Sequence, residues 1–69
     1  MPNPFKSRTA RSQVHFARHI RKQIDAGNPL VTQRMIDALI AACTEWYFDP
    51  ATRPADAQAL HAEMDLLEI

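Results

Sequence analysis

Apolar and polar residues alternate along this chain with the period of amphipathic helices, in three segments separated by turn residues. The spacing predicts an all-α fold: an antiparallel helical hairpin followed by a short C-terminal helix that folds onto it. Residues 1–6 contain two prolines and are predicted to form an irregular arm ahead of a single helical domain, 7–69. The helices are expected at about 8–26, 29–48 and 54–67.

Turn residues set these expected boundaries. Ser7 is the predicted N-cap of the first helix, and Gly27 is the expected residue just past its end. Asn28 is the predicted N-cap of the second helix, with Pro29 in its first position. The segment DPATRP, residues 49–54, is expected to form the turn before the third helix.

The second expected helix has an unusually wide apolar surface, spanning about 160° of the helical wheel. An arc of this width needs two packing neighbours, the first helix and something else. Chains below about 70–80 residues also need support beyond a single small core. We therefore predict a homodimer in which this arc forms the interface, through Met35, Ile36, Leu39 and Cys43.

Composition narrows the class of protein. Of the 69 residues, 46% are hydrophobic and 23% are charged, a balance typical of globular domains. The single cysteine, Cys43, excludes an intrachain disulfide. Neither a membrane-spanning run nor a secretory signal pattern is present, so a cytoplasmic protein is expected, in the host cytoplasm if a phage encodes it.

The formal net charge of zero conceals a division along the chain. Residues 1–26 carry six basic side chains against one acidic one, whereas residues 27–69 carry two basic side chains against seven acidic ones. One interpretation is complementarity within the molecule, with a basic helix lying against acidic ones. The others are a basic surface for nucleic acid and an acidic surface for a basic protein partner.

Few residues offer chemistry. His15 and His19 share a helical face, and His61 or a nearby acid is a conceivable third metal ligand, but the neighbouring basic residues oppose a dication. Cys43 lies in the apolar arc, where a small buried side chain is expected rather than a nucleophile. No catalytic motif and no glycine-rich phosphate loop occur, so neither an enzyme nor a bound cofactor or metal is expected.

Three consecutive aromatic residues end the second expected helix. Trp46, Tyr47 and Phe48 spread over about 200° and cannot all face one core, so at least one is expected to be exposed. In an antiparallel hairpin they lie near Arg8 and Arg11 at the start of the first helix. Aromatic rings beside guanidinium groups are typical of recognition surfaces, and we predict a partner-binding surface from these five residues.

The length, the hairpin from Thr9 to Phe48 across Gly27-Asn28-Pro29, and the Trp46-Tyr47-Phe48 cluster resemble small phage-encoded helical inhibitors of host regulators. Phage quorum-sensing anti-activators are one such type. The resemblance implies a helical-hairpin dimer that blocks the DNA-binding region of a quorum-sensing transcription activator. It assigns no functional residues.

The leading hypothesis is therefore a small non-enzymatic inhibitor or adaptor, which occludes a functional surface of a host regulatory protein. The alternative is a small DNA-associated regulator that contacts phosphates through its basic first helix. A helix-turn-helix reader is disfavoured, because the second helix offers only Gln33 and Arg34 before it becomes apolar.

Overall fold

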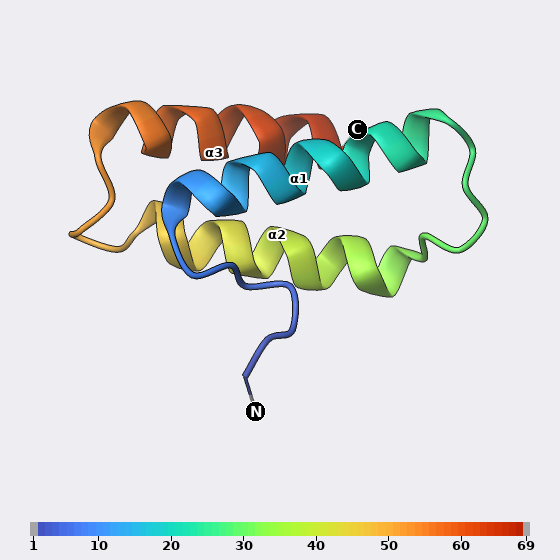
Figure 1. Cartoon of the computed structure of the whole chain (residues 1–69), viewed down its shortest axis with the longest axis horizontal. Helices are drawn as coiled ribbons and strands as arrows, with labels where there is room; N and C mark the ends of the chain where they lie inside the picture. The colour runs from blue at the N-terminus through green and yellow to red at the C-terminus, as the bar shows by residue number, and fades with distance from the viewer. Residues whose placement is uncertain (1, 69) are drawn as a thin grey trace.

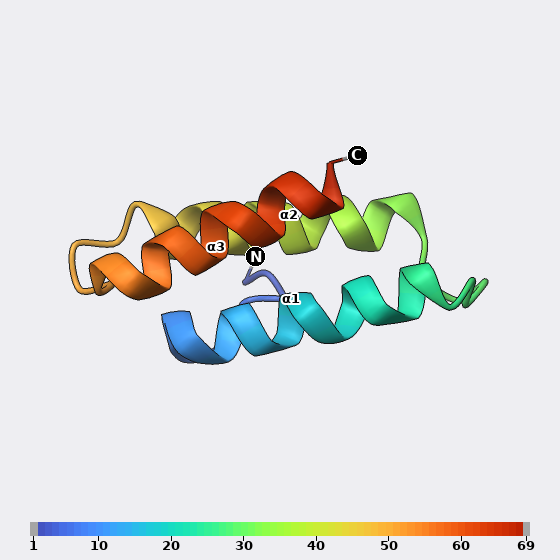
Figure 2. The ribbon, with the colours of Figure 1, turned by 90° about the horizontal axis from the view of Figure 1, so that it is seen from above.

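Three antiparallel helices form the molecule in the computed structural model, which describes residues 2–68. They are α1 (Ala10–Asp25), α2 (Gln33–Tyr47) and α3 (Pro54–Leu67), and α2 runs opposite to the other two (Figures 1 and 2). The predicted all-α class is confirmed, and residues 2–68 contain no strand. The first residue of the predicted arm and the last of the predicted domain lie outside the described residues.

The first helix begins later than predicted. The hydroxyl of Thr9, not that of Ser7, caps α1 by accepting a hydrogen bond from the Ser12 amide at 3.0 Å. Ser7 is engaged elsewhere, since its amide donates to Oε1 of Gln13 at 2.7 Å. Gly27 follows α1 with a φ of 75°. This left-handed conformation favours glycine and agrees with its predicted place just past the helix end.

The second helix also starts later than predicted, at Gln33 rather than Pro29. The side chain of Asn28 accepts a hydrogen bond from the Leu30 amide at 2.9 Å, so it closes a turn instead of capping a helix. The cap is the hydroxyl of Thr32, which accepts from the Met35 amide at 3.2 Å. Thr32, four residues after the predicted cap Asn28, has a side chain of the same capping chemistry and is the residue that caps α2.

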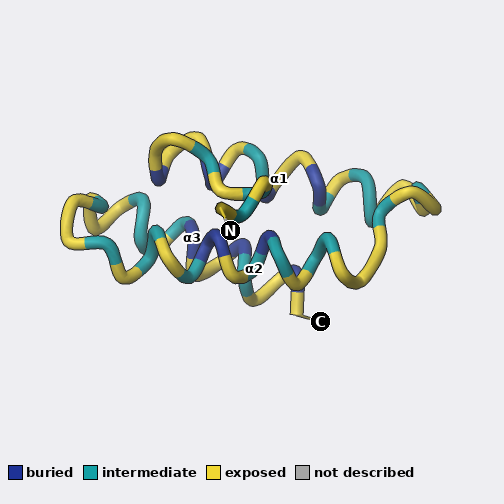
Figure 3. Tube along the Cα trace, turned by 90° about the horizontal axis from the view of Figure 1, so that it is seen from below, coloured by how far each residue is buried: buried dark blue, intermediate teal, exposed yellow. Residues whose placement is uncertain are grey.

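All three helices contribute to one core, and each packs against both others (Figure 3). Leu39 of α2 and Leu60 of α3 are its largest fully buried apolar side chains. The wide apolar arc of α2 does have two neighbours, as predicted, but the second neighbour is α3 of the same chain. With 14 residues against the 15 of α2, α3 is an equal member of a three-helix bundle rather than a short addition to a hairpin.

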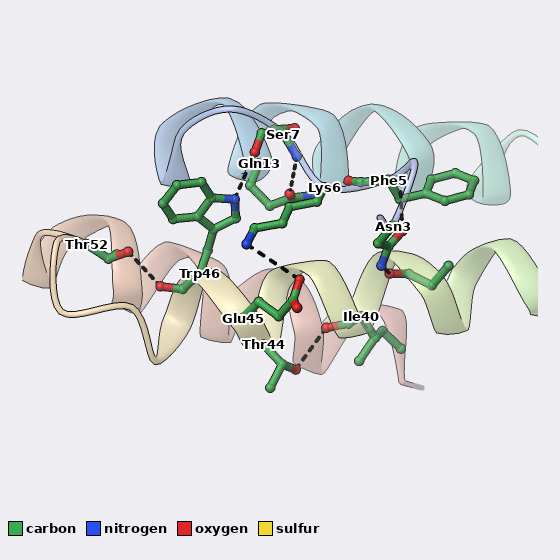
Figure 4. A network of polar contacts seen from close by, with 11 residues as sticks. Asn3, Phe5, Lys6, Ser7, Gln13, Ile40, Thr44, Glu45, Trp46 and Thr52 are labelled. Carbon is green, nitrogen blue, oxygen red and sulfur yellow. Dashed lines mark hydrogen bonds and ion pairs between the residues drawn. The ribbon is translucent and has the colours of Figure 1, made fainter. Parts of the chain in front are cut away.

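The segment before α1 is irregular, as predicted, yet it is firmly held (Figure 4). We call residues 2–7 the arm. The Asn3 side chain donates to the Ala38 carbonyl of α2 at 2.7 Å. The ring of Phe5 stacks on Phe16 of α1 with centroids 5.9 Å apart. Gln13, which is fully buried in α1, donates to the Phe5 carbonyl at 3.0 Å.

Over residues 2–68, no helix combines the length and the apolarity needed to cross a bilayer.

Candidate partner-binding surface

The predicted aromatic residues lie at the end of α2, where Phe48 begins the turn to α3, and side chains fix the shape of this turn. The Thr52 hydroxyl donates to the Trp46 carbonyl at 2.6 Å, and the Ala51 amide donates to the Asp49 side chain at 2.8 Å. The Phe48 amide continues the helical pattern by donating to the Thr44 carbonyl at 3.1 Å. Because the Thr44 and Trp46 carbonyls at this helix end accept hydrogen bonds from residues of the turn, the backbone of the turn is held in a defined conformation.

Trp46 faces α1 and the arm (Figure 4). Its indole Nε1 donates to the Ser7 carbonyl at 3.0 Å, and the Lys6 ammonium lies 5.2 Å from the ring centroid. It shares a hollow of about 260 Å³ with Arg8 and Arg11, so the predicted proximity of these three residues is confirmed. The half-buried indole, however, joins the arm to the helices and is not a free anchor.

Tyr47 and Phe48 point away from that hollow, toward α3 and solvent. Their rings meet edge to face with centroids 5.0 Å apart, and Tyr47 also lies 5.9 Å from the ring of His61 in α3. Phe48 is 75% exposed. Beside the pair is an open hollow of about 320 Å³, lined by Tyr47, Ala57, Gln58 and His61. We call Tyr47, Phe48 and His61 the aromatic edge.

The predicted surface is therefore divided in two. The three aromatic residues do diverge, as their spacing requires, and Phe48 is the exposed one. Arg8 and Arg11, the predicted rim, line the same hollow as Trp46. The aromatic edge lies beside the other hollow, between the end of α2 and α3. The expectation of a single patch with aromatic anchors inside an arginine rim is wrong in this respect, because Trp46 points toward α1.

A buried carboxylate joins α1 to α3. Glu63, which is 5% exposed, lies 3.4 Å from the Nε of Arg18 and 3.2 Å from the Nε of Arg21. Arg21 also pairs with Asp25 at 3.5 Å, and Lys6 of the arm pairs with Glu45 of α2 at 3.7 Å. The interpretation that the basic first helix lies against an acidic one within the molecule is thus correct for Arg18 and Arg21, which pair with Glu63 of α3.

Sequence reasoning missed the two buried polar residues, Gln13 and Glu63. Periodicity arguments place apolar residues inside, so they assign no buried position to a glutamine or a glutamate. The missed signal is positional: Gln13 falls one residue before Val14 on the buried side of α1, and Glu63 falls three residues after Leu60 in α3. Both positions are covered by a neighbouring segment.

The predicted dimer interface is only partly accessible. Leu39 and Cys43 are fully buried in the core of the single chain, so a second copy cannot contact them while this fold is kept. Their inclusion in the interface is wrong, because α1 and α3 already cover this part of the arc. Met35 and Ile36 are half-buried and retain some accessible surface.

The histidines of α1 and the single cysteine show no arrangement for metal binding or nucleophilic chemistry within residues 2–68. His15 and His19 are exposed on α1, and within residues 2–68 no three histidine, cysteine or acidic side chains converge to hold a metal ion. Burial, with a further contribution from the charge of Glu63, raises the pKa of the Cys43 thiol to about 11. The thiol is therefore protonated near neutral pH and is not an activated nucleophile.

The exposed surface of α1 differs from the aromatic edge in chemistry. Arg11, Arg18 and Lys22 are exposed along it, and Arg8 is exposed just before its cap.

Comparisons of the chain with protein-family models, curated proteins and solved structures found no match.

Proposed function

We propose that this chain is a small non-enzymatic protein-binding inhibitor or adaptor, which acts by occluding a surface of its partner through the aromatic edge. The observation that carries this proposal is the side chain of Phe48, 75% exposed on a turn that the protein's own hydrogen bonds hold in place. Aromatic side chains bury a large area at interfaces, and a preorganised turn loses little conformational freedom on binding.

The hollow beside the aromatic edge supports the same proposal. A protruding ring next to a depression lined by Tyr47 and His61 offers a partner both an anchor and a pocket. The partner class is a regulatory protein such as a quorum-sensing transcription activator. This part of the proposal rests on the resemblance to small phage-encoded inhibitors in length, hairpin and aromatic cluster. The three-helix bundle departs from the helical-hairpin dimer that the resemblance implies.

The test compares two equally exposed apolar residues at opposite ends of the bundle. Phe48 ends α2 at the turn to α3, and Leu30, 78% exposed, lies in the connection between α1 and α2. These two connections are at opposite ends of the bundle (Figure 1). Immobilised wild-type protein captures partners from a nuclease-treated lysate of the cell that produces it. The captured regulator is then purified, and its affinity is measured for the wild type, Phe48→Ala and Leu30→Ala.

We expect Phe48→Ala to weaken binding about 30- to 1,000-fold, the range for a truncated hot-spot ring, and Leu30→Ala to change it little. Adding the wild-type chain is expected to release the regulator from its own ligand or target DNA. Unchanged affinity in both Phe48→Ala and Tyr47→Ala, with helix content preserved, would contradict the proposed surface.

Homodimerisation remains a prediction with a narrower basis. The apolar arc no longer requires a second copy, because α3 occupies it, and only the small core still argues for association. The remaining candidates are Met35 and Ile36. Sedimentation at micromolar concentration tests this, since a particle of 7.8 kDa would be the monomer.

A further inference from the structure

The outward surface of α1 is uniformly basic or uncharged polar from Arg8 to Lys22. Every exposed residue in this stretch is an arginine, lysine, histidine, serine or threonine, and none is acidic or apolar. We call this surface the basic face, and its members are Arg8, Thr9, Arg11, Ser12, His15, Arg18, His19 and Lys22. We propose that the basic face binds the phosphate backbone of double-stranded DNA, a function separate from that of the aromatic edge.

The spacing along the helix arranges the face as a row. Arg11, His15, Arg18 and Lys22 are separated by four, three and four residues, so they lie on one side of α1. From Arg11 to Lys22 the row extends about 17 Å at 1.5 Å per residue. Because the rise of a duplex is about 3.4 Å per base pair, a row of this length spans the axial height of about five base pairs. Arg8, just before the helix, extends the row at its N-terminal end.

The cations of the row are largely available to a ligand. Within residues 2–68, Arg8, Arg11 and Lys22 form no ion pair, whereas Arg18 is held 3.4 Å from Glu63 and is still 47% exposed. The first turn of α1 contains no acidic residue, so the partial positive charge of the helix N-terminus adds to the field of Arg8 and Arg11. Asp56, half-buried in α3, lines the same two hollows as Arg11, and its negative charge reduces the positive potential there.

Arg53 enlarges the positive surface at this end of the bundle. It comes from the α2–α3 turn and lines the same hollow as Arg8 and Arg11. Arginines from two segments therefore converge at the N-terminal end of the row. This convergence offers a backbone contact beyond the helix itself.

The chemistry of the face favours nucleic acid over an acidic protein. Stable protein interfaces have an apolar, charge-poor centre, and the basic face has no exposed apolar residue at all. Arginine, lysine, serine and threonine are the side chains that contact phosphate and sugar oxygens. B-form DNA is preferred because its major groove, about 12 Å wide, admits a helix, whereas the corresponding groove of A-form RNA is narrow.

The experiment measures fluorescence anisotropy of a labelled mixed-sequence DNA duplex, titrated with the full chain between about 50 and 200 mM KCl. With about four phosphates neutralised, the plot of log affinity against log salt is expected to have a slope near −3.6. Arg11→Gln and Lys22→Gln are each expected to weaken binding about tenfold at the lowest salt and to reduce the slope by about 0.9. Arg34→Gln, an exposed arginine on α2, is the matched control and should change neither value.

The outcomes separate this proposal from its competitors. Absence of DNA binding at low salt would overturn it, as would equal losses in Arg34→Gln and Arg11→Gln. Tighter binding of polyglutamate would assign the face to an acidic protein, and tighter binding of an RNA duplex of the same sequence would assign it to RNA. Phe48→Ala is expected to leave DNA affinity unchanged, so failure of the aromatic edge and failure of the basic face are distinguishable. Circular dichroism verifies helix content in every variant.

Discussion

Two buried polar residues connect α1 to its neighbours, and they do so in different ways. Gln13 joins α1 to the arm through the backbone groups of Phe5 and Ser7, and Glu63 joins α3 to α1 through the side chains of Arg18 and Arg21. Both are almost fully buried, at 0% and 5% exposure. Their partners differ. The backbone groups of the arm have a fixed position, whereas the arginine side chains can change rotamer and expose their guanidinium groups to water.

The comparison teaches that similar burial does not imply a similar energetic role. If an apolar side chain replaces the neutral amide of Gln13, the two backbone groups that it bonds are left without a hydrogen-bond partner. A buried carboxylate depends on its cations more than they depend on it, because the cations can be solvated when it is removed. Substitutions of Gln13, of Glu63 and of its two arginines test this asymmetry.

The largest effect is expected where Glu63 loses both partners. The double variant Arg18→Ala with Arg21→Ala leaves a buried carboxylate without a cation and should lower the free energy of unfolding by about 3–5 kcal/mol. Glu63→Met removes the buried charge instead and leaves two arginines that reach solvent. Its expected change is within about 1 kcal/mol. Denaturant unfolding followed by circular dichroism measures both, and a larger loss in Glu63→Met would reverse the proposed asymmetry.

At the contact between α1 and the arm, Gln13→Leu is expected to lower the free energy of unfolding by about 1–3 kcal/mol. The substitution preserves much of the side-chain volume but leaves the Ser7 amide and the Phe5 carbonyl without their partner. Gln33→Leu, at an exposed position of α2, is the matched control and should stay within about 0.5 kcal/mol of the wild type. Equal effects of the two substitutions would show that the hydrogen bonds of Gln13 to the arm contribute nothing measurable to stability.

A smaller loss is expected when the arm loses one of its contacts with α2. Trp46→Phe keeps an aromatic ring but removes the Nε1 donor to the Ser7 carbonyl, which should cost about 1 kcal/mol. Tyr47→Phe is the control on the next residue, because no protein hydrogen bond of its hydroxyl is present among residues 2–68. Thermal unfolding followed by circular dichroism compares them. A more stable Trp46→Phe protein would contradict the role of the indole in holding the arm.

The smallest effect is expected at Phe48, which belongs to neither anchoring network. Because its side chain is 75% exposed, Phe48→Ala should change the free energy of unfolding by less than about 0.5 kcal/mol. The same denaturant titration measures it. A loss comparable to that of Gln13→Leu would mean that Phe48 has a structural role, which would remove the basis for assigning it to a binding surface.

Helical periodicity was sufficient to predict three helices and the position of α3, whose expected range of 54–67 matches the structure. The helix starts were less predictable, because Ser7 and Thr9, or Asn28 and Thr32, offer the same capping chemistry within a few residues. The choice depends on contacts with distant residues. Ser7 bonds to Gln13 and Trp46, and these bonds become apparent only when the helices are packed.

The candidate site was predictable in part for the same reason. Wheel geometry correctly separated the three aromatic residues and placed Trp46 near Arg8 and Arg11. It could not show that the Trp46 indole would bond to the arm, because the arm has no periodic pattern of apolar residues. Nor could it show that α3 would cover Leu39 and Cys43 in place of a second copy, since an apolar arc does not specify which segment covers it.

The place of Trp46 gives the molecule an internal spectroscopic reporter of local motion. It is the only tryptophan in the chain, and its indole sits where the arm meets α1 and α2 (Figure 4). Detachment of the arm would expose this fluorophore while the three helices stay formed. Emission and helical ellipticity should therefore diverge at low denaturant concentration. The amides of Phe5 and Ser7 should exchange with solvent deuterium through this partial opening, faster than amides in the middle of α2.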